Sequence, residues 1–303
     1  MSLYFYRKWK FFSNLPPFQI CFVIYVMKIL DLDKLRQWLN ILTAPLMWAL
    51  SSIPQISNYG RTAKEFSEVN DSLLVPYGIA FSIWLPIFIG CIGYSIVQGF
   101  KVNRKRKIYR KIGWYTGIGF LGVCMWSIFS AWGSPRVSLL GTAVIFIPTV
   151  YCLTKSMIIL SDNSTSLDTS EKFWVFIPVS LIAGWTSLAI FLNWAPIVSI
   201  AFGTSLYDIT TNIFMLVLAL AWAAKITYKS YGNLAFSFAI LWGLSWLIVD
   251  FTNSNNLNTS LSYTTIFGIF LIIFTTYVTR NSTKKFEEKE TKNFKINYSI
   301  SSR

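Results

Sequence analysis

The sequence contains no histidine and few cysteines. The absence of histidine from 303 residues removes the commonest general base, the usual zinc or copper ligand and the proximal haem ligand of globin type. The four cysteines share no CxxC spacing, and we interpret them as small apolar core residues rather than as disulfides or a metal site. The motifs of serine hydrolases, zinc proteases and P-loop nucleotidases are missing as well. No set of residues therefore supports an enzyme.

Charged residues are also scarce. They make up 13% of the chain while hydrophobic residues make up 54%, whereas a soluble domain has roughly 25% charged residues. The apolar residues form runs long enough for a helix to cross a bilayer, which takes roughly 20 residues. Eight such runs occur, at 38–57, 74–97, 114–132, 137–160, 173–194, 209–224, 234–249 and 263–278. The sequence predicts an integral membrane protein, an all-α polytopic transmembrane bundle of about eight helices.

The formal net charge of +14 could indicate a nucleic-acid partner, but the positions of the basic residues favour membrane topology. Lys and Arg lie between the apolar runs, most densely at 101–111. The positive-inside rule places this loop in the cytoplasm. Loop 58–72 then falls outside and tail 280–303 inside, so both termini are predicted to be cytoplasmic. We expect a plasma or inner membrane, the lipid bilayer as the main partner and no nucleic acid.

The two ends of the chain differ from its centre. Residues 1–36 are basic, and their apolar stretch 18–30 is short for a span, so we interpret it as an interfacial part of a cytoplasmic segment. Met27 is an alternative start. Residues 280–303 are charged, and we expect a disordered cytoplasmic tail.

Thirteen tryptophans are the most informative residues present. Those near span ends fit the aromatic belts found at membrane interfaces. Five others lie well inside their runs, namely Trp84, Trp126, Trp185, Trp242 and Trp246. An indole N–H within the hydrocarbon needs a partner or faces a cavity. These tryptophans therefore either pack helices together or line a pocket for an aromatic ligand.

Ionisable residues do not mark an ion path through the spans. Asp208 and Asp250 lie at the predicted outer ends of spans, and none of the ionisable residues is central. Ion-driven transporters usually have such groups, or broken helices, at the midplane. This makes a driven ion transporter less favoured.

The second apolar run contains an ordered set of residues. Pro76, Phe81 and Trp84 precede the hydrophobic–aromatic pair Ile87-Phe88.

Two further runs carry related sets. Trp126-Ser127-Ile128-Phe129 lies on the third run, and Trp185, Ala189 and Asn193 lie on the fifth. The last three residues stack on one helix face at spacings of four. In order and spacing, these sets resemble the tryptophan-rich sensory proteins, relatives of the translocator protein. The resemblance covers residues 37–195 as a five-helix core, with 196–279 as additional transmembrane helices.

The resemblance implies a membrane-embedded binder of porphyrin-like or other hydrophobic aromatic ligands, acting as sensor, regulator or carrier. Loop 58–72 would close the site from outside. The residues expected to line it are Trp84, Phe88, Trp126, Phe129, Trp185, Ala189 and Asn193. We expect no cofactor or metal apart from porphyrin as a candidate ligand. Gly and Ala on helix faces are compatible with a homodimer.

Three other functions remain open. The main alternative is a membrane transporter of a small solute or lipid, favoured by the eight predicted spans. An enzyme that degrades a bound pigment is implied by the same resemblance. In a purely structural scaffold, the tryptophans would only pack.

Overall fold

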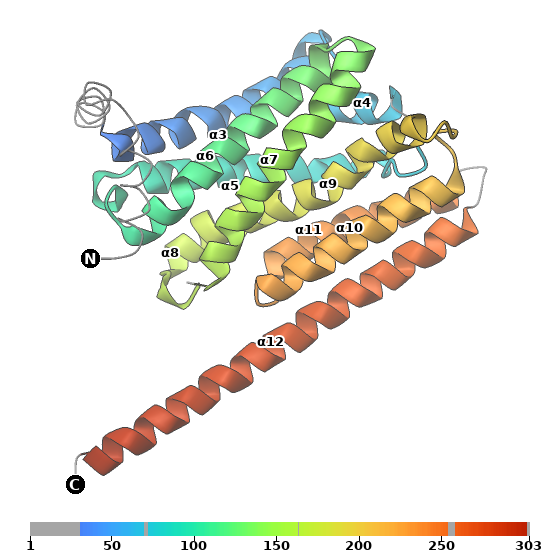
Figure 1. Cartoon of the computed structure of the whole chain (residues 1–303). Coiled ribbons are helices and arrows are strands. Elements are labelled where there is room, and N and C mark those ends of the chain that lie inside the picture. The colour runs from blue at the N-terminus through green and yellow to red at the C-terminus, as the bar shows by residue number, and fades with distance from the viewer. Residues whose placement is uncertain (1–30, 70–71, 163, 254–257, 302–303) are drawn as a thin grey trace, which may run out of the picture.

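The computed structural model describes residues 31–69, 72–162, 164–253 and 258–301, and these residues form a helical bundle without strands (Figure 1). Eight helices are long: α3 (Leu32–Ser57), α5 (Trp84–Gly99), α6 (Lys107–Trp132), α7 (Pro135–Asp162), α9 (Ile177–Ala201), α10 (Ile209–Lys229), α11 (Leu234–Asn253) and α12 (Thr259–Ser301). Short helices and turns join them: α4 (Ala63–Val69), η1 (Gly78–Ile83), η2 (Lys101–Asn103), η3 (Ser164–Ser166), α8 (Thr169–Glu171) and the π-helical turn η4 (Lys172–Phe176). The prediction of an all-α bundle is confirmed.

Seven helices in the described part of the chain are long and apolar enough to cross a membrane. They are α5 to α7 and α9 to α12, with η1 extending α5 and with α8 and η4 extending α9. Seven of the eight predicted spans therefore meet this criterion.

Helix α3 is the eighth long helix, and it is less apolar because its polar residues face the protein. Arg36 and Asn40 are completely buried, whereas Trp38 and Leu42 on the outer face are 57% and 61% exposed. Its 26 residues span about 39 Å at 1.5 Å per residue. A helix of this length with an apolar outer face fits a bilayer, and we count α3 as the eighth span.

The polar face of α3 is bonded to the backbone of α6 and the segment before it. Arg36 donates from Nη1 to the carbonyl of Tyr109 at 2.6 Å and from Nη2 to that of Arg104 at 2.7 Å. One turn further, the Asn40 amide donates to the carbonyl of Gly113 at 2.7 Å. Hydrocarbon offers no such partners, so these bonds determine which face of α3 turns inward. We call this end of the bundle, at the loop between α5 and α6, the basic end, and the opposite end the pocket end.

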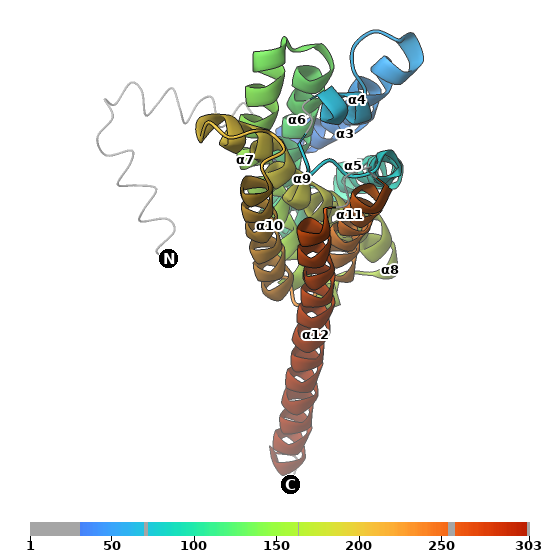
Figure 2. The ribbon, with the colours of Figure 1, turned by 90° about the vertical axis from the view of Figure 1, so that its right-hand side faces the viewer.

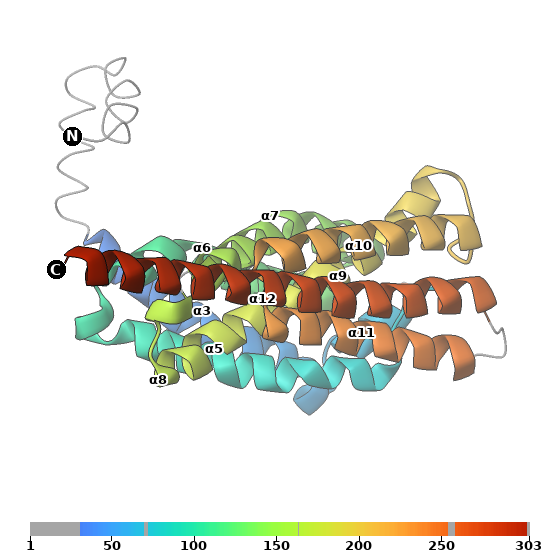
Figure 3. The ribbon, with the colours of Figure 1, turned by 90° about the horizontal axis from the view of Figure 1, so that it is seen from below.

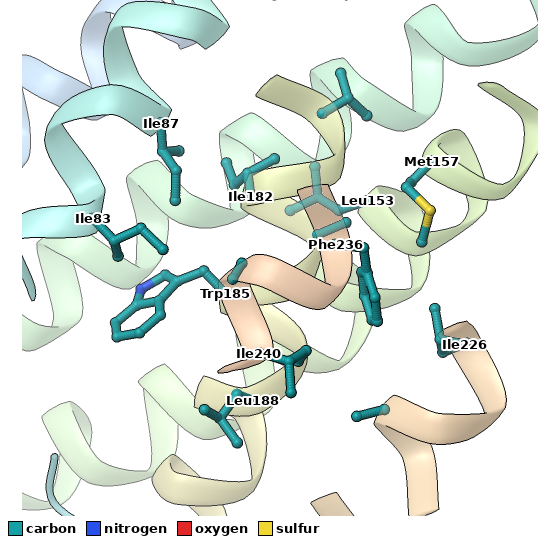
Figure 4. Close-up of a cluster of buried hydrophobic side chains, with 14 of the residues drawn as sticks. Ile83, Ile87, Leu153, Met157, Ile182, Trp185, Leu188, Ile226, Phe236 and Ile240 are labelled. Atoms are coloured by element: carbon teal, nitrogen blue, oxygen red, sulfur yellow. The ribbon is translucent and has the colours of Figure 1, made fainter. Parts of the chain in front are cut away.

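The helices pack as one body. Helix α6 lies between α3 and α7, α9 contacts α5, α7, α10 and α11, and α12 lies across α10 and α11 (Figure 3). One hydrophobic core runs from Ala44 on α3 to Ile272 on α12. Figure 4 shows part of it, with Trp185 of α9 close to Ile83 and with Phe236 and Ile240 of α11 nearby. The first five long helices and the last three thus share a core.

Both ends of the chain contain more helix than expected. Helix α12 continues to Ser301 and projects beyond the bundle (Figure 2), so the prediction of a disordered tail is wrong over 280–301. That stretch contains no Gly or Pro and is rich in Lys and Glu, which favour helix. At the other end α3 begins at Leu32, where the Asp31 side chain accepts the Lys34 N–H at 3.2 Å. The interfacial segment predicted at 18–30 lies outside the described residues.

The contact between α9 and α11 gives a test of the shared core. A Cβ atom on Gly184 would lie 2.6 Å from the Phe236 carbonyl oxygen and 2.8 Å from the Ala239 Cβ. We expect Gly184→Ala to push α11 away and to destabilise the fold by about 1–3 kcal/mol, the usual cost of overpacking. Thermal unfolding of the detergent-solubilised protein measures this change.

The matched control is Gly99→Ala. A Cβ there would meet only the end of the flexible Ile41 side chain, with Cδ1 at 3.0 Å. Its Tm should stay close to that of the wild type. Equal unfolding temperatures for the two variants would contradict the close packing of α9 on α11.

Candidate functional site

A cavity lies at the pocket end, between α4, the segment 72–76, η1 and the adjoining parts of α5, α6, α7 and α9. The empty space among its walls, with its mouth included, is about 650 Å³, but water-sized molecules can move through only about 50 Å³ of it. The lining residues are Phe66, Ser67, Ser72, Leu74, Val75, Pro76, Phe81, Trp84, Trp126, Leu139, Phe146, Trp185, Leu188, Ala189, Leu192, Asn193 and Pro196. The walls are mostly apolar and aromatic, as is usual in sites for small hydrophobic ligands.

Trp84 is the centre of the aromatic wall. Its ring centroid lies 6.3 Å from that of Trp126 and 6.2 Å from that of Trp185, which it meets edge to face. Phe88 stacks on the other side of Trp84 at 5.2 Å, and Phe81 meets Trp185 at 6.1 Å. Offset and edge-to-face pairs of this kind are the favoured arrangements of aromatic rings. Three helices and η1 are thus joined by one aromatic cluster.

The indole groups of this cluster differ in their hydrogen bonds. Trp126 donates from Nε1 to Asn193 Oδ1 at 3.2 Å, and the Asn193 amide donates to the Ala189 carbonyl at 2.8 Å. The Trp84 side chain is only 8% exposed, and its Nε1 has no acceptor among the described residues. A buried N–H without an acceptor is costly. This unpaired donor belongs to a residue of the cavity wall.

Helix α4 covers the cavity, as predicted for loop 58–72. Phe66 is buried and meets the Trp126 ring edge to face at 5.7 Å. Arg61 lies just before α4 and fixes its position. Its Nη2 donates to the Gly133 carbonyl at 2.6 Å and to the Ser138 hydroxyl at 3.1 Å. These bonds tie the loop to the turn between α6 and α7. The cover is attached at one side by polar contacts and contributes one aromatic ring to the cavity wall.

Helix α11 supports the opposite lip of the cavity. The Tyr77 N–H donates to the Trp246 carbonyl at 3.2 Å, and their rings stack at 6.0 Å. Trp242 donates from Nε1 to the Ala80 carbonyl at 2.9 Å. The segment held in this way carries Phe81 into the cavity. The two tryptophans of the seventh predicted span therefore position a wall rather than line it.

The structure brings together five of the seven residues expected at the site: Trp84, Trp126, Trp185, Ala189 and Asn193. Phe88 lies one helical turn beyond Trp84 and stacks on its ring, but it does not line the cavity. Phe129 packs over Gly141 of α7, where a Cβ would lie 2.8 Å from the Phe129 Cγ. Although residues three apart share a helix face, this contact holds Phe129 against α7, and Phe129 is not among the residues that line the cavity.

Several lining residues were not predicted. Phe146 stacks flat on Trp126 at 5.5 Å with an interplanar angle of 6°, and Phe66 comes from the covering helix. Leu139, Leu188, Leu192 and Pro196 complete the apolar wall. Phe81 was part of the recognised set, whereas nothing in the local pattern distinguishes Phe146 from the many other aromatic residues in spans.

No Asp or Glu side chain of the described residues lines this cavity. Asp208 caps α10, where the bond from the Thr211 N–H at 2.8 Å holds the pKa of its carboxyl below the usual value. Asp250 borders a separate surface groove beside Tyr77 and Gly78. In the described part of the chain, no three Cys, Asp or Glu side chains lie close enough to hold a metal ion.

The support from α11 can be tested by Trp242→Phe. This variant keeps the ring and loses the bond to the Ala80 carbonyl, which should cost about 1 kcal/mol. Hydrogen–deuterium exchange should become faster at the amides of 77–83. Trp222→Phe is the matched control because the Trp222 N–H finds no partner in the described part of the chain. Unchanged exchange in Trp242→Phe would show that the bond does not hold this segment.

Comparison with known proteins agrees with the resemblance noted in the sequence. A family model described as TSPO-like protein matches residues 37–278. The match includes all the cavity-lining residues and extends beyond residue 195 across α10, α11 and slightly less than half of α12. No curated protein and no solved structure matches the chain. Because the matched region covers well over half of the 303 residues, the chain belongs to the family of TSPO-like proteins.

Proposed function

We propose that this membrane protein binds a flat, hydrophobic aromatic ligand of porphyrin type in the cavity beneath α4, as a sensor, regulator or carrier. The observation that carries the proposal is the buried, unpaired indole N–H of Trp84, a residue that lines the cavity together with Trp126 and Trp185. We also propose that the basic end faces the cytoplasm, as the positive-inside rule predicts.

The chemistry of the walls selects a class of ligand. Tryptophan and phenylalanine rings offer flat surfaces for stacking, with the positive ring edges and negative ring faces arranged at several angles. A tetrapyrrole offers an extended aromatic face, together with ring nitrogens and carboxylates that accept hydrogen bonds. An acceptor placed against Trp84 would satisfy the buried donor, and the apolar remainder of the ligand would fill the space. Such a ligand gains affinity both from burial and from one directed hydrogen bond.

The cavity as it stands is too narrow for a large ligand. The volume open to water-sized molecules, about 50 Å³, is far below the 300–1,000 Å³ typical of pockets for drug-sized ligands. A ligand of porphyrin size therefore requires α4 to move away and the rings around Trp84 to separate. Helix α4 has only seven residues, and its one aromatic anchor in the cavity is Phe66. Displacing this cover is the conformational step that we assign to ligand entry.

Transport of a small solute or lipid is the alternative function. Its ionisable candidates, Asp208 and Asp250, lie at helix ends outside the aromatic cavity. Asp208 is further engaged as the cap of α10. These placements favour the binding function, while uptake into proteoliposomes remains the direct assay for transport.

The proposed binding can be tested by quenching of tryptophan fluorescence with protoporphyrin in nanodiscs. The wild type should show saturable quenching. Trp84→Phe keeps an aromatic ring but removes the donor, and we expect about fivefold weaker affinity, which corresponds to a net hydrogen bond of about 1 kcal/mol. Trp185→Phe should also weaken binding because it reduces the stacking surface.

Trp222→Phe is the control, since this residue lies on α10 outside the cavity and its loss removes a fluorophore without touching the site. Its affinity should equal that of the wild type. Linear quenching that is the same in all the variants would mean partition into lipid and would contradict the proposal. The proteoliposome assay with Asp208→Asn and Asp250→Asn would then take precedence.

A further inference from the structure

A second groove lies at the basic end, on the other side of the bundle core from the α3–α6 contacts. Water-sized molecules can occupy about 660 Å³ of this open groove. It is bordered by the end of α7, the π-helical turn η4, the turn between α10 and α11, and α12. The lining residues are Ser161, Ser164, Lys172, Phe176, Ile177, Leu181, Ser230, Tyr231, Asn233, Leu234, Ala235, Phe238 and Arg280. Unlike the aromatic cavity, this groove has one part that is basic and polar and another part that is apolar.

Two cations border the polar part of the groove. Lys172 begins η4, and Arg280 extends from α12. The ion pairs formed among the described side chains involve other residues. A nearby acid, Asp162, accepts the Tyr231 hydroxyl at 3.2 Å. The two positive charges are therefore available to an anion.

The turn between α10 and α11 places Arg280. Tyr231 and Gly232 have positive φ angles of 57° and 67°, and the Gly232 N–H donates to the Thr227 carbonyl at 2.9 Å. A Cβ on Gly232 would lie 2.7 Å from the Arg280 Cγ and 2.7 Å from the Thr276 carbonyl oxygen. Only glycine allows this approach, and it brings the stem of Arg280 directly over the turn.

The apolar part of the groove continues onto the outer surface of the bundle. Leu234 is 55% exposed and Phe238 is 54% exposed, and both lie on α11. Leu181 and Ile177 of α9 form the facing wall. In a membrane this surface contacts acyl chains, so the groove leads from a cationic rim into hydrocarbon.

The position of the groove matches the depth of lipid headgroups. Helices α7 and α10 end beside it, and α9 and α11 begin beside it. The same end of the bundle carries the dense basic loop 101–111. Basic pockets between transmembrane helices at the cytoplasmic side are typical sites for anionic headgroups.

We propose that this groove binds one anionic phospholipid, with its phosphate between Lys172 and Arg280 and an acyl chain along Leu181, Leu234 and Phe238. Charge complementarity selects the anionic headgroup, and the apolar wall selects a lipid over a soluble phosphate. The site is separate from the aromatic cavity, and the proposal does not depend on the ligand of that cavity.

Binding can be measured by native mass spectrometry and by thermal unfolding of the delipidated protein after addition of phosphatidylglycerol or phosphatidylcholine. The wild type should retain phosphatidylglycerol and be stabilised by it more than by phosphatidylcholine. The double variant Lys172→Gln/Arg280→Gln should bind phosphatidylglycerol about tenfold more weakly or worse, because two charges near the headgroup are lost. Its unfolding in phosphatidylcholine checks that it still folds.

The matched control is Lys101→Gln/Lys105→Gln, which removes two exposed charges from the same end but outside the groove. This variant should bind phosphatidylglycerol as the wild type does. A third variant, Phe238→Asn, changes the apolar wall at an exposed position and leaves both charges in place. It should also reduce retention of phosphatidylglycerol.

Four results would overturn the proposal. The first is an equal loss of phosphatidylglycerol binding in the groove and control variants, which would indicate diffuse electrostatic attraction. The second is wild-type affinity for phosphatidylglycerol in the groove variant. The third is a wild type that does not distinguish the two lipids. The fourth is a change of oligomeric state on size exclusion in the groove variant without a change in lipid retention, which would assign the groove to a second copy of the chain.

Discussion

The structure depends on one constraint: hydrocarbon offers no hydrogen-bond partners, so a polar group inside the bundle is costly unless it finds a partner in the protein or in a ligand. Arg36 and Asn40 meet it through backbone carbonyls next to and on α6, and this turns α3 with its polar face inward. Trp194 meets it through the Ala143 carbonyl on α7 at 3.0 Å. Helix rotation and helix contacts in this bundle follow from such bonds as much as from apolar packing.

The same constraint separates Trp84 from the other tryptophans. Buried indole N–H groups without acceptors also occur at Trp132 and Trp222. Trp132 packs against the backbone of Gly60, where a Cβ would lie 2.6 Å from its Nε1, and Trp222 lies on α10 away from the cavity. Trp84 alone of these three lines a cavity with other aromatic walls. This location is what distinguishes the unpaired donor of Trp84 from the other two.

The sequence predicts those features that depend on local patterns. Each apolar run carries its own signal, and spacings of four residues place Trp185, Ala189 and Asn193 on one face of α9, where they line the cavity. Features that depend on packing between segments far apart in the chain are not predicted by local patterns. Phe146 reaches the cavity only because α7 is rotated onto Trp126. The charged tail is helical because its Lys and Glu residues favour helix, whereas its overall composition had indicated disorder.

Helix α11 connects the two ends of the molecule. Leu234 and Phe238 near its start border the groove at the basic end, while Trp242 and Trp246 hold the lip of the aromatic cavity. The rings of Phe238 and Trp242 are in contact with centroids 6.2 Å apart, so one face of a 20-residue helix reaches from one site to the other. The last three helices are therefore not an appendage to a five-helix binding core. They supply one wall of the groove and the support of the cavity, and any ligand in either site rests against a segment that α11 positions.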